Sequence, residues 1–174
     1  HKAWQVVLKK KQPMLVLEDD ALLSRYSAIL LKMLEQRTDC DLATLEVRNR
    51  QKIVGTGQPL VEDFSLVPLY QDRTGAAAYV LWPSGAQILL DKAKTTPPGL
   101  ADAFISSTYA LRCLQVEPAA AIQLDQCEAY EVNNTLKTVS SISAEKKPDL
   151  TYATPLENLR FQARRITAQY RMGM

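Results

Sequence analysis

The sequence predicts an α/β fold in which a mixed sheet is flanked by helices. Apolar runs of strand length, such as residues 14–17 and 76–82, alternate with segments whose apolar residues recur at helical spacing. The middle of the chain has several short strands in succession, too many for a regular doubly wound sheet. At 174 residues and 47% hydrophobic content, the chain suffices for one domain with a core, or for one domain and a tail.

The first half of the chain is expected to contain two helices and two strands before an irregular region. Pro13 ends the first helix, and Leu22, Tyr26, Ile29 and Met33 recur at steps typical of the second. In chain order the pattern predicts a helix over 2–10, a strand over 14–17, a helix over 21–36, a strand over 41–47, and a loop or irregular hairpin over 48–59.

The second half is expected to alternate strands and helices before a polar stretch and a final helix. The segment 95–99, with Pro97, Pro98 and Gly99, breaks the helix that starts at Ser84. The pattern predicts strands over 64–70 and 76–82, helices over 84–92 and 101–111, strands over 114–117 and 121–124, a polar segment over 140–147, and a helix over 156–170.

Composition narrows the class of partner and the compartment. Lys and Arg total 21 against 19 Asp and Glu, so the net charge of +2 predicts no nucleic-acid partner. Three scattered cysteines indicate reduced thiols and a cytoplasmic protein, and no apolar run reaches membrane-spanning length. The first residues do not resemble a signal peptide and lack an initiator Met, which indicates an incomplete amino terminus.

The carboxyl-terminal segment is basic. After Glu157 the chain has no acidic residue, whereas Arg160, Arg164, Arg165 and Arg171 follow. Such a helix can lie against an anionic surface such as the cytoplasmic face of the inner membrane, or it can present a solvated face.

The most informative segment is Met14 to Ala21, where four apolar residues lead directly into Glu18, Asp19 and Asp20. Acids at the end of a buried strand stand where open α/β sheets bind ligands, and three adjacent carboxylates call for a neutralising cation. In the alternative interpretation the turn is solvated and Asp19 or Asp20 caps a helix that starts near Ala21.

The same acidic turn resembles the start of bacterial response-regulator receiver domains, in which such acids bind Mg²⁺ beside a phosphate-accepting Asp. The segment Asp41 to Glu46 is similar to the strand that ends in the acceptor. Glu46 stands in the place of that Asp, and the separation from Asp20 is short for a receiver. A receiver-like domain therefore remains an alternative.

A resemblance to glycosyltransferase family 25, the lipooligosaccharide galactosyltransferases, covers about residues 1–145. It rests on several short segments in order: His1 to Trp4, Leu15 to Ala21 with its acidic triplet, Gly75 to Leu81 followed by Gly85-Ala86, Leu100 to Phe104, Pro118 with Ile122-Gln123, and Ser140 to Ser143. Family members begin with a nucleotide-binding half that this sequence lacks before His1.

The resemblance implies a GT-A-like fold, with residues 1–150 as a catalytic domain that lacks its amino-terminal part and 151–174 as a basic tail. It also implies inverting transfer of a hexose, galactose in this family, from a UDP-sugar to a lipooligosaccharide-type acceptor with Mn²⁺ or Mg²⁺.

The implied site residues come from three segments. Glu18, Asp19 and Asp20 are the candidate metal ligands, with Asp20 expected to bind directly. Asp102 is the candidate general base, and Gly75, Tyr79 and Arg73 are candidate substrate contacts, with Arg48 or Arg50 as further partners for phosphate or an acidic acceptor. A degenerate transferase domain that binds a glycan or a partner without turnover is the other alternative.

Overall fold

The computed structural model describes residues 1–71 and 75–134, together with Pro155, Leu159, Ala163 and Ile166. The chain divides into two compact units, His1–Leu136 and Lys137–Met174. The first unit has the mixed α/β architecture that the sequence predicts, with a mixed sheet flanked by helices. The polar segment 140–147 and the expected domain boundary at residue 150 lie outside the described residues.

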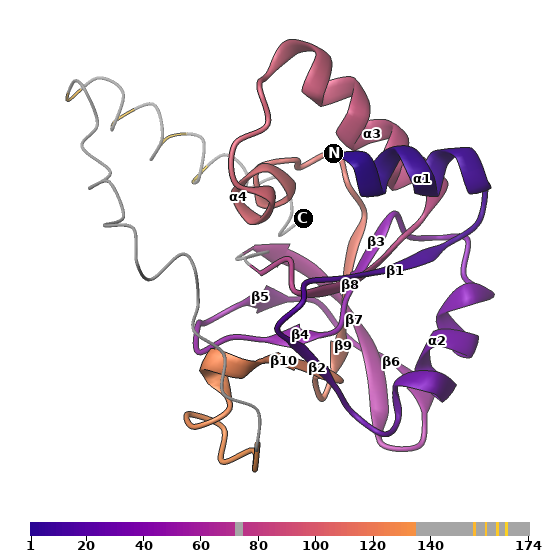
Figure 1. Ribbon diagram of the computed structural model, residues 1–174, viewed down its shortest axis with the longest axis vertical. Coiled ribbons are helices and arrows are strands. Elements are labelled where there is room, and N and C mark those ends of the chain that lie inside the picture. Colours follow the sequence, from indigo (N-terminus) through magenta and orange to yellow (C-terminus); the bar gives the residue numbers. More distant parts are fainter. Residues whose placement is uncertain (72–74, 135–154, 156–158, 160–162, 164–165, 167–174) are drawn as a thin grey trace. The chain divides into compact units, whose positions relative to one another are not determined.

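Within the described residues, the main sheet has seven strands (Figure 1). They are β1 (Met14–Leu17), β3 (Leu42–Thr44), β5 (Ile53–Val54), β6 (Gln58–Val61), β7 (Phe64–Gln71), β8 (Ala78–Leu81) and β9 (Cys113–Glu117). Their order is β1-β8-β3-β9-β7-β5, and β6 also pairs with β7. Among the strand pairs of this main sheet, β3 with β9 is parallel and the others are antiparallel. Because β1 stands at one end of this order, the acidic residues that follow it lie at an edge of the sheet.

A second, three-stranded sheet brings together three segments that are distant in the sequence. It consists of β2 (Ala21–Leu23), β10 (Ala121–Gln123) and β4 (Glu46–Val47), with β10 in the middle. Strand β10 is antiparallel to β2 and parallel to β4. This small sheet holds the turn after β1 next to the end of β10 and the start of the segment that follows β4.

The helices cover both faces of the main sheet. They are α1 (Lys2–Lys10), α2 (Ser27–Glu35), α3 (Pro83–Thr95) and α4 (Ala101–Ser106), and a 3₁₀ turn, η1, spans Leu124–Gln126. Side chains alternate between two cores along β8: Tyr79 and Leu81 pack with α1, α3 and α4, whereas Ala78 and Val80 pack with α2. Because successive side chains of β8 enter different cores, both faces of the strand are buried, and the run 76–82 is therefore apolar at every position.

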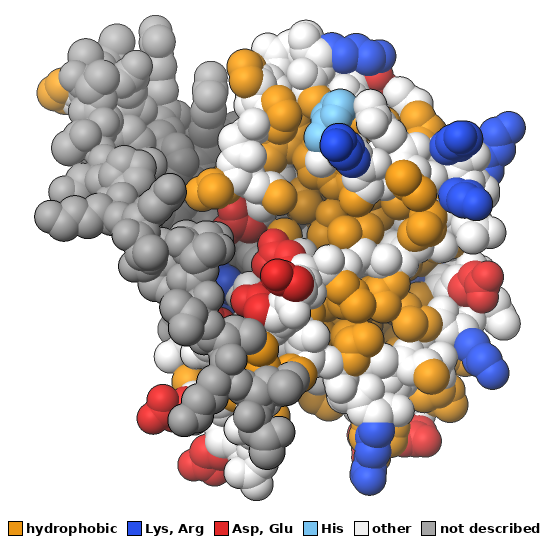
Figure 2. Space-filling model, in the orientation of Figure 1, with side chains coloured by type: hydrophobic (Ala, Val, Ile, Leu, Met, Phe, Trp, Pro, Cys, Tyr) orange, Lys and Arg blue, Asp and Glu red, His pale blue; other side chains and the backbone are white. Residues whose placement is uncertain are grey.

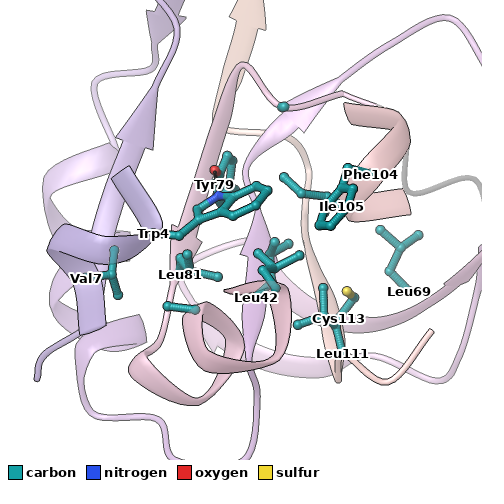
Figure 3. Packing of buried hydrophobic residues seen from close by; sticks show 13 residues of the cluster. Trp4, Val7, Leu42, Leu69, Tyr79, Leu81, Phe104, Ile105, Leu111 and Cys113 are labelled. Atoms are coloured by element: carbon teal, nitrogen blue, oxygen red, sulfur yellow. Dashed lines mark hydrogen bonds between the residues drawn. The ribbon is translucent and has the colours of Figure 1, made fainter. Parts of the chain in front are cut away.

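The core under α1 and α4 is built around aromatic rings. The indole of Trp4 stacks on Phe104 with ring centroids 5.5 Å apart, and its Nε1 donates a hydrogen bond of 3.1 Å to the hydroxyl of Tyr79 (Figure 3). These contacts fix α4 against α1 and β8. Ala101 and Asp102 are the first two residues of α4.

Several elements differ from the sequence prediction. The expected helix over 21–36 begins only at Ser27, because residues 21–23 form β2 and pair with β10. The expected helix over 101–111 ends at Ser106, and the expected strand over 41–47 is divided into β3 and β4. Periodicity alone cannot detect a partner strand that lies about a hundred residues away, which is why a short apolar segment was assigned to a helix.

Four residues of the carboxyl-terminal segment are described, and all four are helical and exposed. Leu159 and Ile166 are among them, and both are helical, as the predicted helix over 156–170 requires. Among the described residues, no helix combines the length and the apolar character needed to cross a bilayer.

Candidate functional site

The acidic turn, residues Glu18–Asp20, connects edge strand β1 to β2. The amide of Glu18 donates to the carbonyl of Ala77 (2.8 Å), and the amide of Ala21 donates to the carbonyl of Glu18 (3.2 Å). Because residues 21–23 are a strand, the interpretation of Asp19 or Asp20 as the cap of a helix starting at Ala21 is wrong. Helix capping therefore does not account for these carboxylates.

Two of the three carboxylates converge on one side-chain amide. Gln123 lies at the end of β10, opposite Ala21 in the strand register, and its residue is only 6% exposed. Its Nε2 donates to Oε2 of Glu18 (3.0 Å) and to the carboxylate of Asp20 (3.3 and 3.4 Å). Its Oε1 accepts a hydrogen bond from the guanidinium of Arg48. The two carboxylates thus face one point, which an amide with partial positive charge occupies.

The pKa of Glu18 depends on the charged groups around this point. Partial burial raises the pKa of Glu18 above its ordinary value, and repulsion from Asp20, Asp102 and Asp19 raises it further, whereas Arg48 lowers it. A positive charge beside these carboxylates would relieve this repulsion. Figure 2 shows a group of acidic side chains beside a broad apolar area on the same face.

Asp102, the candidate base, lies in α4, whose Phe104 and Ile105 pack in the core that contains Trp4 and Tyr79. It stands in the first turn of α4, is partly exposed, and its Oδ1 accepts a hydrogen bond of 2.6 Å from the amide of Ala103. Its negative charge is one of the causes that raise the pKa of Glu18. Asp19 is exposed and contributes a smaller repulsion to Glu18.

The candidate substrate contacts have different surroundings. Tyr79 is 4% exposed and its hydroxyl points to the indole of Trp4 (Figure 3), yet Glu18 is near enough to add to the burial that raises the pKa of Tyr79. Gly75 lies against Glu46, and Arg73 lies outside the described residues. Their contact with a substrate stays a prediction.

Glu46 is a buried acid beside this site. It is fully buried in β4, and its Oε2 accepts a hydrogen bond of 2.9 Å from the amide of Ala77. Its Oε1 has no hydrogen-bond partner among the described residues. Burial raises the pKa of Glu46 to about 7, although Ala77, Arg48 and Lys52 oppose the change. The Ala77 peptide links the two acids, because its carbonyl accepts from the amide of Glu18.

Sequence reasoning missed two of these residues. In the sequence, Glu46 is recognisable only as the counterpart of a receiver's phosphate acceptor, and Gln123 only as part of a family-like segment. Both interrupt apolar strands, Leu45-Glu46-Val47 and Ala121-Ile122-Gln123-Leu124, and a polar residue in a buried strand must find a polar partner. A polar residue within an apolar strand was therefore the signal in the sequence that pointed to Glu46 and Gln123.

The described residues contain no group of three or more His, Cys, Asp or Glu side chains arranged to hold a metal ion. The site offers a pair of converging carboxylates instead. A scan of the chain against protein-family models finds no match, and a search of curated proteins also finds none.

Proposed function

We propose that this protein is a metal-dependent inverting glycosyltransferase that moves a hexose, galactose by family resemblance, from a UDP-sugar to a lipooligosaccharide-type glycan acceptor. The observation that carries the proposal is the convergence of Glu18 and Asp20 on the amide of Gln123. The charge of Asp102 also acts on Glu18, whose pKa it raises. The mixed α/β architecture and the order of the family-like segments are compatible with a GT-A-like fold.

The two carboxylates fit a hard divalent cation that shares its coordination with a substrate. Mg²⁺ and Mn²⁺ are commonly held by one or two protein carboxylates while phosphate oxygens and water complete the shell. Oxygens of both side chains lie within 3.0–3.4 Å of one atom, Gln123 Nε2, so the two carboxylates are close enough to share an ion beside that amide. A cation bound there supplies neutralisation of a departing diphosphate.

The protein's own side chains supply the remaining requirements. Gln123, held by Arg48, donates to both carboxylates and so orients Glu18 and Asp20 toward one another. Asp102 is the group assigned to accept the proton of the attacking acceptor hydroxyl, since it is a partly exposed carboxylate on a different element from the cation ligands. Direct displacement requires the base and the leaving group on opposite sides of the sugar.

The receiver alternative is less well supported. Glu46, its counterpart of the phosphate acceptor, is fully buried, and an acceptor must reach a phosphodonor. Strand β1 pairs antiparallel with β8, whereas receiver domains have a doubly wound, mostly parallel sheet.

The proposal is tested by hexose transfer from UDP-galactose to a lipooligosaccharide glycan, assayed with the full chain in Mn²⁺. We expect Asp20→Asn to lower turnover at least about a hundredfold, because an amide cannot replace a carboxylate as a ligand for a hard cation. Asp125→Asn, which alters an exposed acid in η1, is the matched control and should retain full turnover.

The folded state of Asp20→Asn is verified by its urea midpoint, which should stay close to that of the unaltered protein. Full turnover in folded Asp20→Asn, or absence of any Mn²⁺-dependent transfer by the unaltered chain, would contradict the proposal.

A further inference from the structure

A pocket of about 450 Å³ has Arg48 among its lining residues. The segment from Val47 to Lys52 forms one wall, and Val54, Glu117 and Tyr130 complete the lining. A volume of this size is within the range that accommodates small ligands. All lining residues belong to the first compact unit.

The pocket has an excess of positive charge. Among the described residues, Arg48, Arg50 and Lys52 line it, against one carboxylate, that of the exposed Glu117. The side chains of Asn49 and Gln51 and the hydroxyl of Tyr130 add hydrogen-bonding groups. Guanidinium and ammonium groups gathered around one concave surface favour phosphate or carboxylate oxygens, which accept several charge-assisted hydrogen bonds at once.

Arg48 connects this pocket to the candidate site. Its terminal nitrogen donates to Gln123, which in turn donates to Glu18 and Asp20. Its Nε is buried and has no hydrogen-bond partner among the described residues. A buried donor without an acceptor is costly, so an oxygen supplied by a ligand would satisfy it.

Lys52 is held in place from within the protein. Its Nζ donates to Oε1 of Gln115 and to the carbonyl of Glu46 (3.4 Å). Gln115 itself is fully buried and also donates to the carbonyl of Glu46 (3.3 Å). The fold thus fixes one cation of the pocket by buried contacts, whereas Arg50 is exposed and stands at its rim.

We propose that this pocket binds the anionic group, phosphate or carboxylate, of a negatively charged sugar in the glycan acceptor. The assignment to the acceptor rests on the proposed function, which places the donor's diphosphate at the cation held by Glu18 and Asp20. Arg48, Arg50 and Lys52 line a separate pocket, and its positive charge suits an anionic group of the other substrate.

The test is a nuclear magnetic resonance titration of the full chain without Mn²⁺ or donor. The probes are inorganic phosphate, a hexose 6-phosphate, a hexuronic acid and neutral galactose. We expect amide shifts within residues 47–54 for anionic probes and none for galactose. A response to the phosphates alone, or to the hexuronic acid alone, assigns the anionic group.

Arg50→Gln should weaken binding of the responding anion about tenfold, because one charge-assisted contact is lost. Arg25→Gln, an exposed arginine outside the pocket, should leave binding unchanged. Equal binding of galactose, no shifts within 47–54, or displacement of the anionic sugar by UDP would overturn the proposal. Because the titration uses neither donor nor metal, its failure is distinct from the loss of transfer activity that would contradict the proposed function.

Discussion

Gly75→Ala is expected to lower the free energy of unfolding by about 3 kcal/mol, from backbone strain of ~1–2 kcal/mol together with a displaced buried carboxyl. Gly75 has φ of 100°, a region that alanine rarely adopts. A Cβ built at Gly75 would overlap Oε1 of Glu46. Glu46 would have to move, and the amide of Ala77 would lose its hydrogen bond to Oε2.

The measurement for Gly75→Ala is urea denaturation followed by tryptophan fluorescence. Gly99→Ala is the matched control, since a Cβ there meets no atom within 4 Å. It should change the unfolding free energy by less than about 0.5 kcal/mol. A Gly75→Ala protein as stable as the unaltered one would show that Glu46 does not fill the space beside this glycine.

The stability of the protein is expected to fall by roughly 3 kcal/mol as the pH rises from 5 to 8, and Glu46→Gln is expected to abolish most of this fall. The pKa of Glu46 rises from 4.5 to about 7 on folding because the side chain is buried. Between these two values the folded state binds more protons than the unfolded state. The contribution of Glu46 to stability is therefore full below pH 4.5 and decreases until Glu46 has ionised in the folded protein.

The groups that face Glu46 do not reverse this sign. Arg48 and Lys52 favour its ionised form, and Glu18 opposes it, yet desolvation is the largest contribution. The raised pKa of Glu18 acts in the same direction, so a smaller fall should persist in Glu46→Gln.

Urea midpoints at pH 5 and pH 8 measure this dependence. Glu35→Gln, which alters an exposed glutamate of α2, should behave as the unaltered protein does. An identical loss of stability between the two pH values in Glu46→Gln and in the unaltered chain would refute the assignment to Glu46.

Local sequence patterns predicted the elements whose identity depends on their own residues. The helix over 2–10 and the strand over 14–17 were predicted with the boundaries that the structure has. Pro13 and the uninterrupted apolar run mark these boundaries without reference to the rest of the chain. The strand that carries Tyr79 was recognisable for the same reason.

Elements that depend on distant partners were not predictable in this way. Residues 21–23 carry enough apolar side chains for a helix, and only pairing with β10 makes them a strand. The same pairing places Gln123 between Glu18 and Asp20, so the acidic turn was visible in the sequence and its amide partner was not. Glu46 likewise acquires its raised pKa from burial in the folded chain, where it lies in β4 against Gly75.

The side-chain amide of Gln123 provides the most direct measurement of the central claim, that Glu18 and Asp20 hold a divalent cation. In a titration of the full chain with Mn²⁺, paramagnetic broadening should remove the Gln123 resonance at low ion concentration, and Asp20→Asn should require at least about tenfold more ion. The amide of Gln87, which donates to the single carboxylate of Asp91 (2.9 Å), is the internal control and should broaden only later. Broadening of Gln123 no earlier than Gln87, or unchanged in Asp20→Asn, would contradict the claim.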